Sequence, residues 1–92
     1  MILEIVTPEA TLLHTNVEIV TVPGINGEFQ MLKDHAPIVT LLQEGKVKIS
    51  GNISLEKEYA SKFTKDAEGN TVLQISSGTI ELKNNKVIVL AD

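Results

Sequence analysis

Short runs of β-branched and aliphatic residues, each closed by Gly, Pro or Asn, recur along almost the whole of this 92-residue chain. Runs of about five or six residues are too short for stable helices, and Val, Ile and Thr favour strands. The predicted strands lie at 2–7, 17–22, 28–32, 38–42, 46–50, 71–76, 79–83 and 86–91. Many short strands at this spacing are typical of a sandwich or barrel. We predict a single all-β domain over residues 1–92, a flattened β-sandwich of about ten short strands in two sheets.

Turn residues predict two hairpins. Asn84 and Asn85 lie between two strand-like runs, and Asn tolerates the positive φ that a two-residue primed turn requires. Gly45 follows Glu44 between the runs 38–42 and 46–50, and glycine can adopt a left-handed conformation there. We therefore expect residues 79–83 to pair with 86–91, and residues 38–42 to pair with 46–50.

The segment 51–70 is ambiguous. Ile53, Leu55 and Tyr59 fit the alternation of a strand, but Leu55, Tyr59 and Phe63 also fit one face of a helix. We interpret the segment as a long protruding hairpin insertion, strand-like over 53–63, with its turn near 67–70. A short helix is the alternative.

Composition narrows the classes of partner. The chain has eight Lys, no Arg and twelve acidic residues, for a net charge of −4. Phosphate backbones and anionic lipids are bound mainly through clustered Lys and Arg, so we expect no nucleic-acid partner. The apolar runs are far shorter than the roughly 20 residues of a membrane helix, and the N-terminus lacks the basic region of a signal peptide, so no direct membrane insertion is expected.

Catalytic and metal-binding patterns are not evident in the sequence. The chain has two His and no Cys, and His35 adjoins Asp34 on an extended segment, where neighbouring side chains point in opposite directions. The glycines between residues 23 and 27 precede no Lys-Ser/Thr pair, unlike a phosphate-binding loop. We therefore expect no catalytic residue, no cofactor and no metal site.

One block carries a specific pattern. Residues 20–49 read V-T-V-P-G-I-N-G-E-F-Q-M-L-K-D-H-A-P-I-V-T-L-L-Q-E-G-K-V-K-I. This block resembles the epsilon subunit of the F-type ATP synthase, whose motif is P-G-x-x-G-x-F-x-x-L-x-x-H-A-P-x-x-T-x-L-x-x-G-x-V. The residues that match the motif are Pro23, Gly24, Gly27, Phe29, Leu32, His35, Ala36, Pro37, Thr40, Leu42, Gly45 and Val47.

The resemblance implies a function in a rotary complex. It suggests a non-catalytic subunit of the central stalk that links the gamma subunit to the c-ring in a proton-translocating ATP synthase. Such a subunit would be peripheral, on the cytoplasmic face of a bacterial inner membrane. Longer members of the family continue beyond the sequence that corresponds to Leu90-Ala91-Asp92 into a C-terminal helical hairpin. The sequence here stops at Asp92, so a short form that lacks the hairpin is expected.

The resemblance also nominates contact residues. The turn before the G-x-F strand faces the c-ring in the family, which suggests Gly27, Glu28 and Phe29 as the ring contact. The H-A-P corner and the following strand lie towards gamma, and this suggests the candidates His35, Pro37, Ile38 and Thr40. The run 38–42 has more apolar residues than one inward face can hold, so we expect some of them to be exposed.

A second function class stays open from the residues alone. A stand-alone β-sandwich could bind a small ligand or a protein. For a ligand, such a module would need a pocket lined by aromatic and convergent polar side chains. The sequence has only three aromatic residues, Phe29, Tyr59 and Phe63, and this count disfavours that reading.

Overall fold

The computed structural model describes residues 1–51 and 53–92; position 52, inside the predicted 51–70 hairpin, lies outside the described residues. Over these ranges the chain forms ten strands and one short 3-10 helix, η1 (Ala60–Lys62). The strands are β1 (Ile2–Val6), β2 (Thr11–Asn16), β3 (Ile19–Gly24), β4 (Gly27–Met31), β5 (Ile38–Leu42), β6 (Gly45–Ser50), β7 (Phe63–Lys65), β8 (Thr71–Ile75), β9 (Gly78–Lys83) and β10 (Lys86–Ala91).

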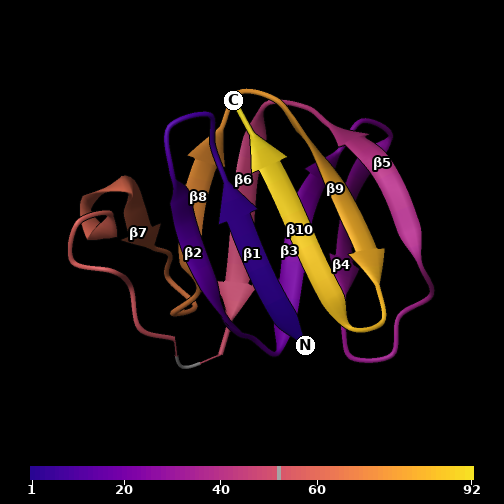
Figure 1. Cartoon of the computed structure of the whole chain (residues 1–92), viewed down its shortest axis with the longest axis horizontal. Helices are drawn as coiled ribbons and strands as arrows, with labels where there is room; N and C mark the ends of the chain where they lie inside the picture. Colours follow the sequence, from indigo (N-terminus) through magenta and orange to yellow (C-terminus); the bar gives the residue numbers. More distant parts are fainter. Residues whose placement is uncertain (52) are drawn as a thin grey trace.

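The strands form two layers that are joined along one edge. One layer has the order β2-β1-β10-β9-β5, and the other has β3-β6-β8-β7 with β4 on the outer side of β3. Figure 1 shows the first layer in front of the second. The layers meet where Gly24 at the end of β3 pairs with Leu42 at the end of β5, so one hydrogen-bonded path runs through both. The predicted all-β sandwich of two sheets is confirmed, with this joint as an added feature.

Alternation along the strands places the aliphatic side chains between the layers. In β10, Val87, Val89 and Ala91 are buried, while Lys86 and Leu90 are exposed. Side chains in a strand alternate between the two faces, so each inner face contributes every second residue to the core. The buried core cluster contains Leu3, Ile5, Leu12, Leu13, Val17, Val20, Val22, Met31, Leu42, Val47, Ile49, Phe63, Leu73, Ile75, Ile80, Leu82, Val87, Val89 and Ala91.

One predicted hairpin is confirmed and the other is wrong. Asn84 and Asn85 have φ values of 52° and 60°, and Lys83 pairs with Lys86 around them, as a primed turn requires. The run 38–42, however, pairs with β9, and 46–50 pairs with β3 and β8. The chain changes layer at Gln43–Glu44, so β5 and β6 belong to different sheets. Gly45 is needed for close packing, because a Cβ there would lie 2.7 Å from the Pro23 Cβ.

The segment 51–70 is only partly as predicted. Residues 53–59 form neither helix nor strand, and the 3-10 helix η1 follows at Ala60. The predicted strand over 53–63 is therefore wrong. Its last residue, Phe63, does begin the short strand β7, which pairs with β8 across a turn at 66–70. The partly buried side chains of Ile53, Leu55 and Tyr59 pack against the core cluster, so the segment lies on the sandwich.

Strand β2 has no counterpart among the predicted strands. Its sequence, T-L-L-H-T-N, buries Leu12 and Leu13 together and then ends in polar residues, so it lacks regular alternation. The adjacent buried pair follows from a shift of the β1–β2 register between Ile5 and Val6. An edge strand with an irregularity of this kind gives a weak periodic signal.

The turn at 66–70 is held by a single carboxylate. Asp66 Oδ1 accepts the backbone N–H groups of Glu68 and Asn70, each at 2.9 Å, and Asp66 Oδ2 accepts Asn70 Nδ2 at 3.0 Å. The hydrogen bond from the Asn70 side chain is the main cause of a lowered Asp66 pKa. Burial opposes it, and the two backbone donors and the charge of Lys48 lower the pKa further.

Gly24→Ala should lower the free energy of unfolding by about 1–3 kcal/mol, as overpacking does. A Cβ at this position would lie 2.7 Å from the Phe29 ring and 2.8 Å from the Gly27 carbonyl oxygen. Urea denaturation measures the effect. The exposed control Ser61→Ala should stay within about 0.5 kcal/mol of the parent. Parental stability in Gly24→Ala would show that the β3–β4 end is loosely packed.

Asp66→Asn should reduce the pH dependence of stability in acid. Because the folded-state pKa of Asp66 is lowered, the carboxylate stabilises the fold above its unfolded pKa, and this stabilisation is lost as the pH falls through the folded value. The parent should therefore exceed Asp66→Asn in stability at pH 7, and the gap should shrink progressively as the pH falls below about 4. Thermal melts across this range, with Glu68→Gln as control, measure the difference. A gap between parent and Asp66→Asn that persists unchanged in acid would refute the assignment.

Candidate functional site

The three candidate c-ring residues lie together at the start of β4. Strands β3 and β4 form a tight hairpin in which Gly24 pairs with Gly27 around Ile25 and Asn26. Gly27 has a φ of 123°, which favours glycine, and it is exposed at the tip. Glu28 faces the outer surface of the second layer, while Phe29 turns inward and is only half-buried. The Phe29 ring packs over Gly24 at the rim of the core.

Glu28 has a partner within the chain. Its Oε2 lies 3.7 Å from Lys48 Nζ on β6. The pair lies at the edge of a polar depression of about 300 Å³, whose other lining residues include Thr21, Gln30 and Glu68. An ion pair this exposed contributes little to stability, so the carboxylate stays available to another partner.

The structure brings some of the candidate gamma residues close to the candidate c-ring residues. Ile38 and Thr40 face the interior, where they extend the inner rows of β9 through their pairing with Leu82 and Ile80. Together with Phe29 they line a depression of about 280 Å³ between β4 and β5, beside the joint between the layers. Two candidate gamma residues thus lie beside a candidate c-ring residue.

His35 and Pro37 lie just before the first residue of β5, at the end of the strand away from Leu42. They belong to the exposed loop 32–37, next to the β9–β10 turn. The His35 backbone N–H donates to the Leu32 carbonyl at 3.1 Å, and its ring Nδ1 lies 2.7 Å from the Ala36 carbonyl oxygen. The proposed gamma set is therefore divided between an exposed corner and the inner side of β5.

The exposed apolar side chains of β5 alternate with the candidates Ile38 and Thr40. Val39 is 73% exposed and Leu41 is 55% exposed, whereas Leu42 is buried. This confirms the expectation that the run 38–42 has more apolar residues than the core accepts. The number of apolar residues in this run was a sufficient signal for a two-sided strand, but it could not say which residues face outward.

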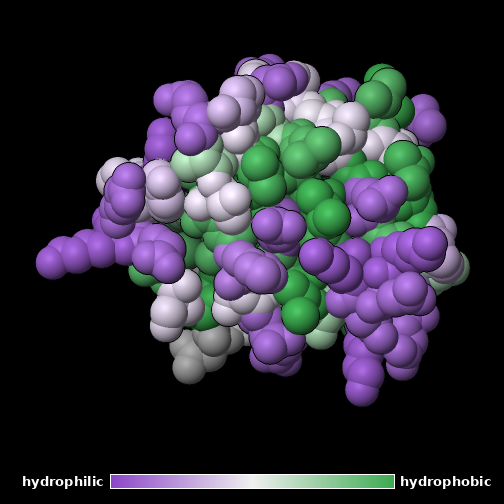
Figure 2. Space-filling model, in the orientation of Figure 1, coloured by the Kyte–Doolittle hydropathy of each residue, from purple (hydrophilic) through white to green (hydrophobic). Residues whose placement is uncertain are grey.

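Cross-strand registry arranges this outer face in rows. Leu41 pairs with Thr79, Thr79 with Leu90, and Leu90 with Val6. The next row, from Val39 through Glu81 and Ile88 to Glu4, is mixed, and the row after it carries Lys83 and Lys86. Figure 2 shows the result, with hydrophobic atoms gathered above hydrophilic ones on the right of the front face.

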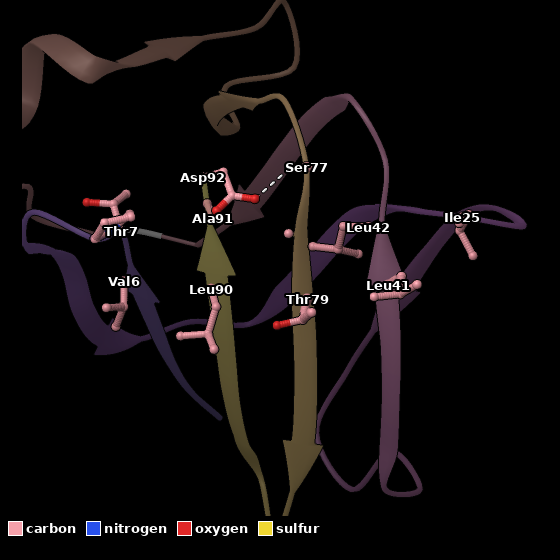
Figure 3. A pocket seen from close by; sticks show the side chains of 12 residues that line it. Val6, Thr7, Ile25, Leu41, Leu42, Ser77, Thr79, Leu90, Ala91 and Asp92 are labelled. Carbon is pink, nitrogen blue, oxygen red and sulfur yellow. Dashed lines mark hydrogen bonds between the residues drawn. The ribbon is translucent and has the colours of Figure 1, made fainter.

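The apolar row borders a groove of about 580 Å³. Figure 3 shows Leu41, Thr79 and Leu90 on adjacent strands, with Ile25 beyond Leu41. The Ile25 backbone N–H donates to the Leu41 carbonyl at 3.0 Å, which fixes the β3–β4 tip beside β5. At the far end, Ser77 Oγ donates to Asp92 Oδ2 at 2.7 Å. The groove contains no aromatic side chain, unlike the pocket that a ligand-binding module would need.

Residues 1–51 and 53–92 contain no helix whose length and apolarity would allow it to cross a membrane. Within the same residues, His, Asp and Glu side chains nowhere gather in a group of three or more that could hold a metal ion.

The comparisons with known proteins agree on one family. Residues 1–62 match the family model of the ATP synthase delta/epsilon chain β-sandwich domain. The ATP synthase epsilon chain of Desulforamulus reducens is 36% identical over 90 residues, which cover 98% of this chain and 57% of that protein. The epsilon chain of Chlorobaculum tepidum is 34% identical over 90 residues, covering 98% of this chain and 86% of that protein.

Solved structures share the fold. A chain of the Euglena gracilis mitochondrial ATP synthase, in a structure of OSCP, F1 and c-ring, has a TM-score of 0.74 at 18% identity. The match covers 99% of this chain and 49% of that one. A chain from the central stalk and c-ring structure of the Tetrahymena thermophila enzyme has a TM-score of 0.72 at 14% identity, with 99% and 62% covered.

The extent of the match differs among relatives. The chain spans little more than half the length of several curated relatives, including the one from Desulforamulus reducens, but most of the length of the one from Chlorobaculum tepidum. The family model, the 90-residue alignments and the two-layer fold agree with the P-G-x-x-G-x-F and H-A-P pattern found in the sequence. The chain therefore belongs to the ATP synthase epsilon chain family.

Proposed function

We propose that this chain is a non-catalytic rotor subunit that links the gamma subunit to the c-ring of a proton-translocating ATP synthase. The observation that carries the proposal is the outer face of β5, where Val39 and Leu41 are exposed and Leu41 lines an apolar groove. A contiguous apolar patch of this kind marks a contact with another macromolecule. Its place beside the family's H-A-P corner supports gamma as the partner.

On this proposal, gamma covers the strand β5 and its two ends. His35 and Pro37 form the contact at the exposed corner, and Val39 and Leu41 provide the apolar centre. Ile38 and Thr40 face inward, so they contribute at the depression between β4 and β5. Apolar anchors near the centre of an interface, surrounded by polar residues, carry most of the binding free energy.

The c-ring contact is proposed at the start of β4. Gly27 is exposed at the tip, Glu28 presents a carboxylate on the outer surface, and Phe29 fixes the strand to the rim of the core. A basic group of the ring could replace Lys48 as the partner of Glu28, since the existing pair is exposed and 3.7 Å long. Both contacts would then share one edge of the sandwich.

A packed sandwich suits the transmission of torque. Its core side chains are close-packed, and a close-packed interior deforms little under load. Rotation of the ring would therefore turn the stalk without slippage at this subunit. The proposal places the chain peripherally on the cytoplasmic face of a bacterial inner membrane. That residues 51–70 are an insertion relative to the family stays a prediction.

Val39→Glu should weaken binding to gamma by at least tenfold. A charge at the centre of an apolar contact must be desolvated without a partner, and central anchors often account for about 2 kcal/mol or more. Because Val39 is largely exposed in the free chain, the melting temperature should fall only slightly, through repulsion from the cross-strand neighbour Glu81. Binding to immobilised gamma subunit measures the effect.

Thr64→Glu is the matched control for this substitution. Thr64 is an exposed strand residue of β7, in the other layer, so its replacement adds the same charge away from the proposed contact. Equal affinity of Val39→Glu and the parent for gamma would remove the β5 face from the proposal. Equal losses in both variants would show that net charge, not position, controls binding.

Glu28→Gln should weaken attachment to the c-ring while the melting temperature stays that of the parent. An exposed ion pair contributes about 0–1 kcal/mol to folding, but loss of a partly desolvated interface charge costs about 2–5 kcal/mol of binding. Ring-dependent ATP synthesis in reconstituted vesicles and a thermal melt measure the two effects.

Two controls separate the contact from the fold. Glu58→Gln removes an exposed carboxylate elsewhere and should leave attachment unchanged. Phe29→Ala should destabilise the chain by about 2 kcal/mol, less than a fully buried Phe would lose, because its ring is only half-buried. Parental coupling in Glu28→Gln would assign the carboxylate to the protein surface alone.

A further inference from the structure

We propose that Asn85 and Asp34 form a positioning pair that holds the loop 32–37 in the shape that gamma binds. The inference rests on the proposed function, because it assigns a role to the corner that contains His35 and Pro37. It adds two residues that lie outside the candidate contact set.

The pair is reciprocal and joins distant parts of the chain. The Asp34 backbone N–H donates to Asn85 Oδ1 at 2.6 Å, and Asn85 Nδ2 donates to Asp34 Oδ1 at 3.0 Å. The two residues are 51 positions apart in sequence. Two hydrogen bonds between the same two residues restrict both the distance and the relative orientation of the loop and the β9–β10 turn.

The loop has little else to hold it. Every residue from 32 to 37 is exposed, so no side chain of the loop is buried in the core. Within it, the bond from the His35 N–H to the Leu32 carbonyl is local. A segment with few buried contacts opens easily unless specific hydrogen bonds restrain it. For the loop 32–37, the Asp34–Asn85 pair supplies such a restraint from a distant strand turn.

Backbone conformation indicates that the restraint works against strain. Asp34 has a φ of 66°, in the left-handed region that non-glycine residues adopt at a cost. It is the third residue of the turn from Leu32 to His35, a position where positive φ is usually met by Gly or Asn. A strained residue is maintained when its surroundings fix it, and here Asn85 fixes both the N–H group and the carboxylate of Asp34.

Asn85 is itself held firmly. Its φ of 60° belongs to the primed turn, and its carbonyl accepts the Ile2 N–H at 2.9 Å at the start of β1. One residue thus connects the N-terminal strand, the β9–β10 turn and the loop. The position of the loop is therefore fixed relative to β9 and β10. The outer face of these two strands continues the apolar surface of β5. Preorganisation of this kind reduces the ordering cost of binding.

Asn85→Asp tests the pair, because Asp also tolerates positive φ but places a second carboxylate against Asp34. In the free chain, the amide hydrogens of Asp34 and His35 should exchange with solvent about tenfold faster, while core amides of β9 and β10 keep their protection. Affinity for gamma should fall about fivefold, mainly through slower association, since fewer molecules carry the competent loop.

The double variant Asp34→Asn/Asn85→Asp is the rescue. It restores a carboxamide opposite a carboxylate with the two exchanged, and it should return both exchange and gamma association to within about twofold of the parent. Asn84→Asp is the matched control: it makes the same change at the neighbouring residue of the turn, which also has a positive φ, and it should alter neither quantity.

The proposal would be overturned if the amide hydrogens of Asp34 and His35 exchanged in Asn85→Asp at the rate of the parent. It would also be overturned if the double variant failed to restore the slow exchange and the gamma binding that Asn85→Asp had lost. Faster exchange with unchanged gamma binding would also overturn it, provided that Val39→Glu weakens gamma binding. If Val39→Glu leaves gamma binding unchanged as well, the proposed gamma surface itself has failed. The exchange measurement needs no partner, so the two failures are distinguishable.

Discussion

Burial of aliphatic side chains between two layers is the interaction on which the rest of this structure depends. The inner faces of the strands contribute Ile, Leu and Val in alternation, and the outer faces are free to carry other residues. Within the described residues, strand pairing joins the layers where Gly24 meets Leu42. The geometry of the surface is therefore a consequence of which residues the core accepts.

Close approach at the joined edge explains two glycines of the family motif. Gly24 has no room for a Cβ beside Phe29, and Gly45 has none beside Pro23. These positions bring the β3–β4 tip against β5, with the Ile25 N–H bonded to the Leu41 carbonyl. The proposed ring and gamma contacts are neighbours because the chain changes layer at this edge. The motif residues thus shape a surface as well as a fold.

Charge on the outer faces follows the two-layer plan. The front face runs from the apolar row at Leu41 and Leu90 to the lysines 83 and 86, and the other outer face carries the Glu28–Lys48 pair in a polar depression. Folding does not require these particular residues on either outer face, because the core is formed by the inward-facing side chains. A stalk subunit that met two different partners would need two such chemically different surfaces.

The sequence by itself determined the fold class, the primed turn at Asn84-Asn85, the family and the surplus of apolar residues in 38–42. These depend on alternation, turn chemistry and a fixed-register motif, all of which are local in sequence. Only the tertiary structure decided that 38–42 and 46–50 lie in different sheets, that T-L-L-H-T-N is an edge strand, and that residues 53–59 form no strand. It also decided that Val39 and Leu41 face outward while Ile38 and Thr40 complete inner rows, and that Asn85 reaches Asp34. Strand pairing and the facing of a two-sided apolar strand depend on contacts between residues far apart in sequence, and a periodic pattern carries no information about them.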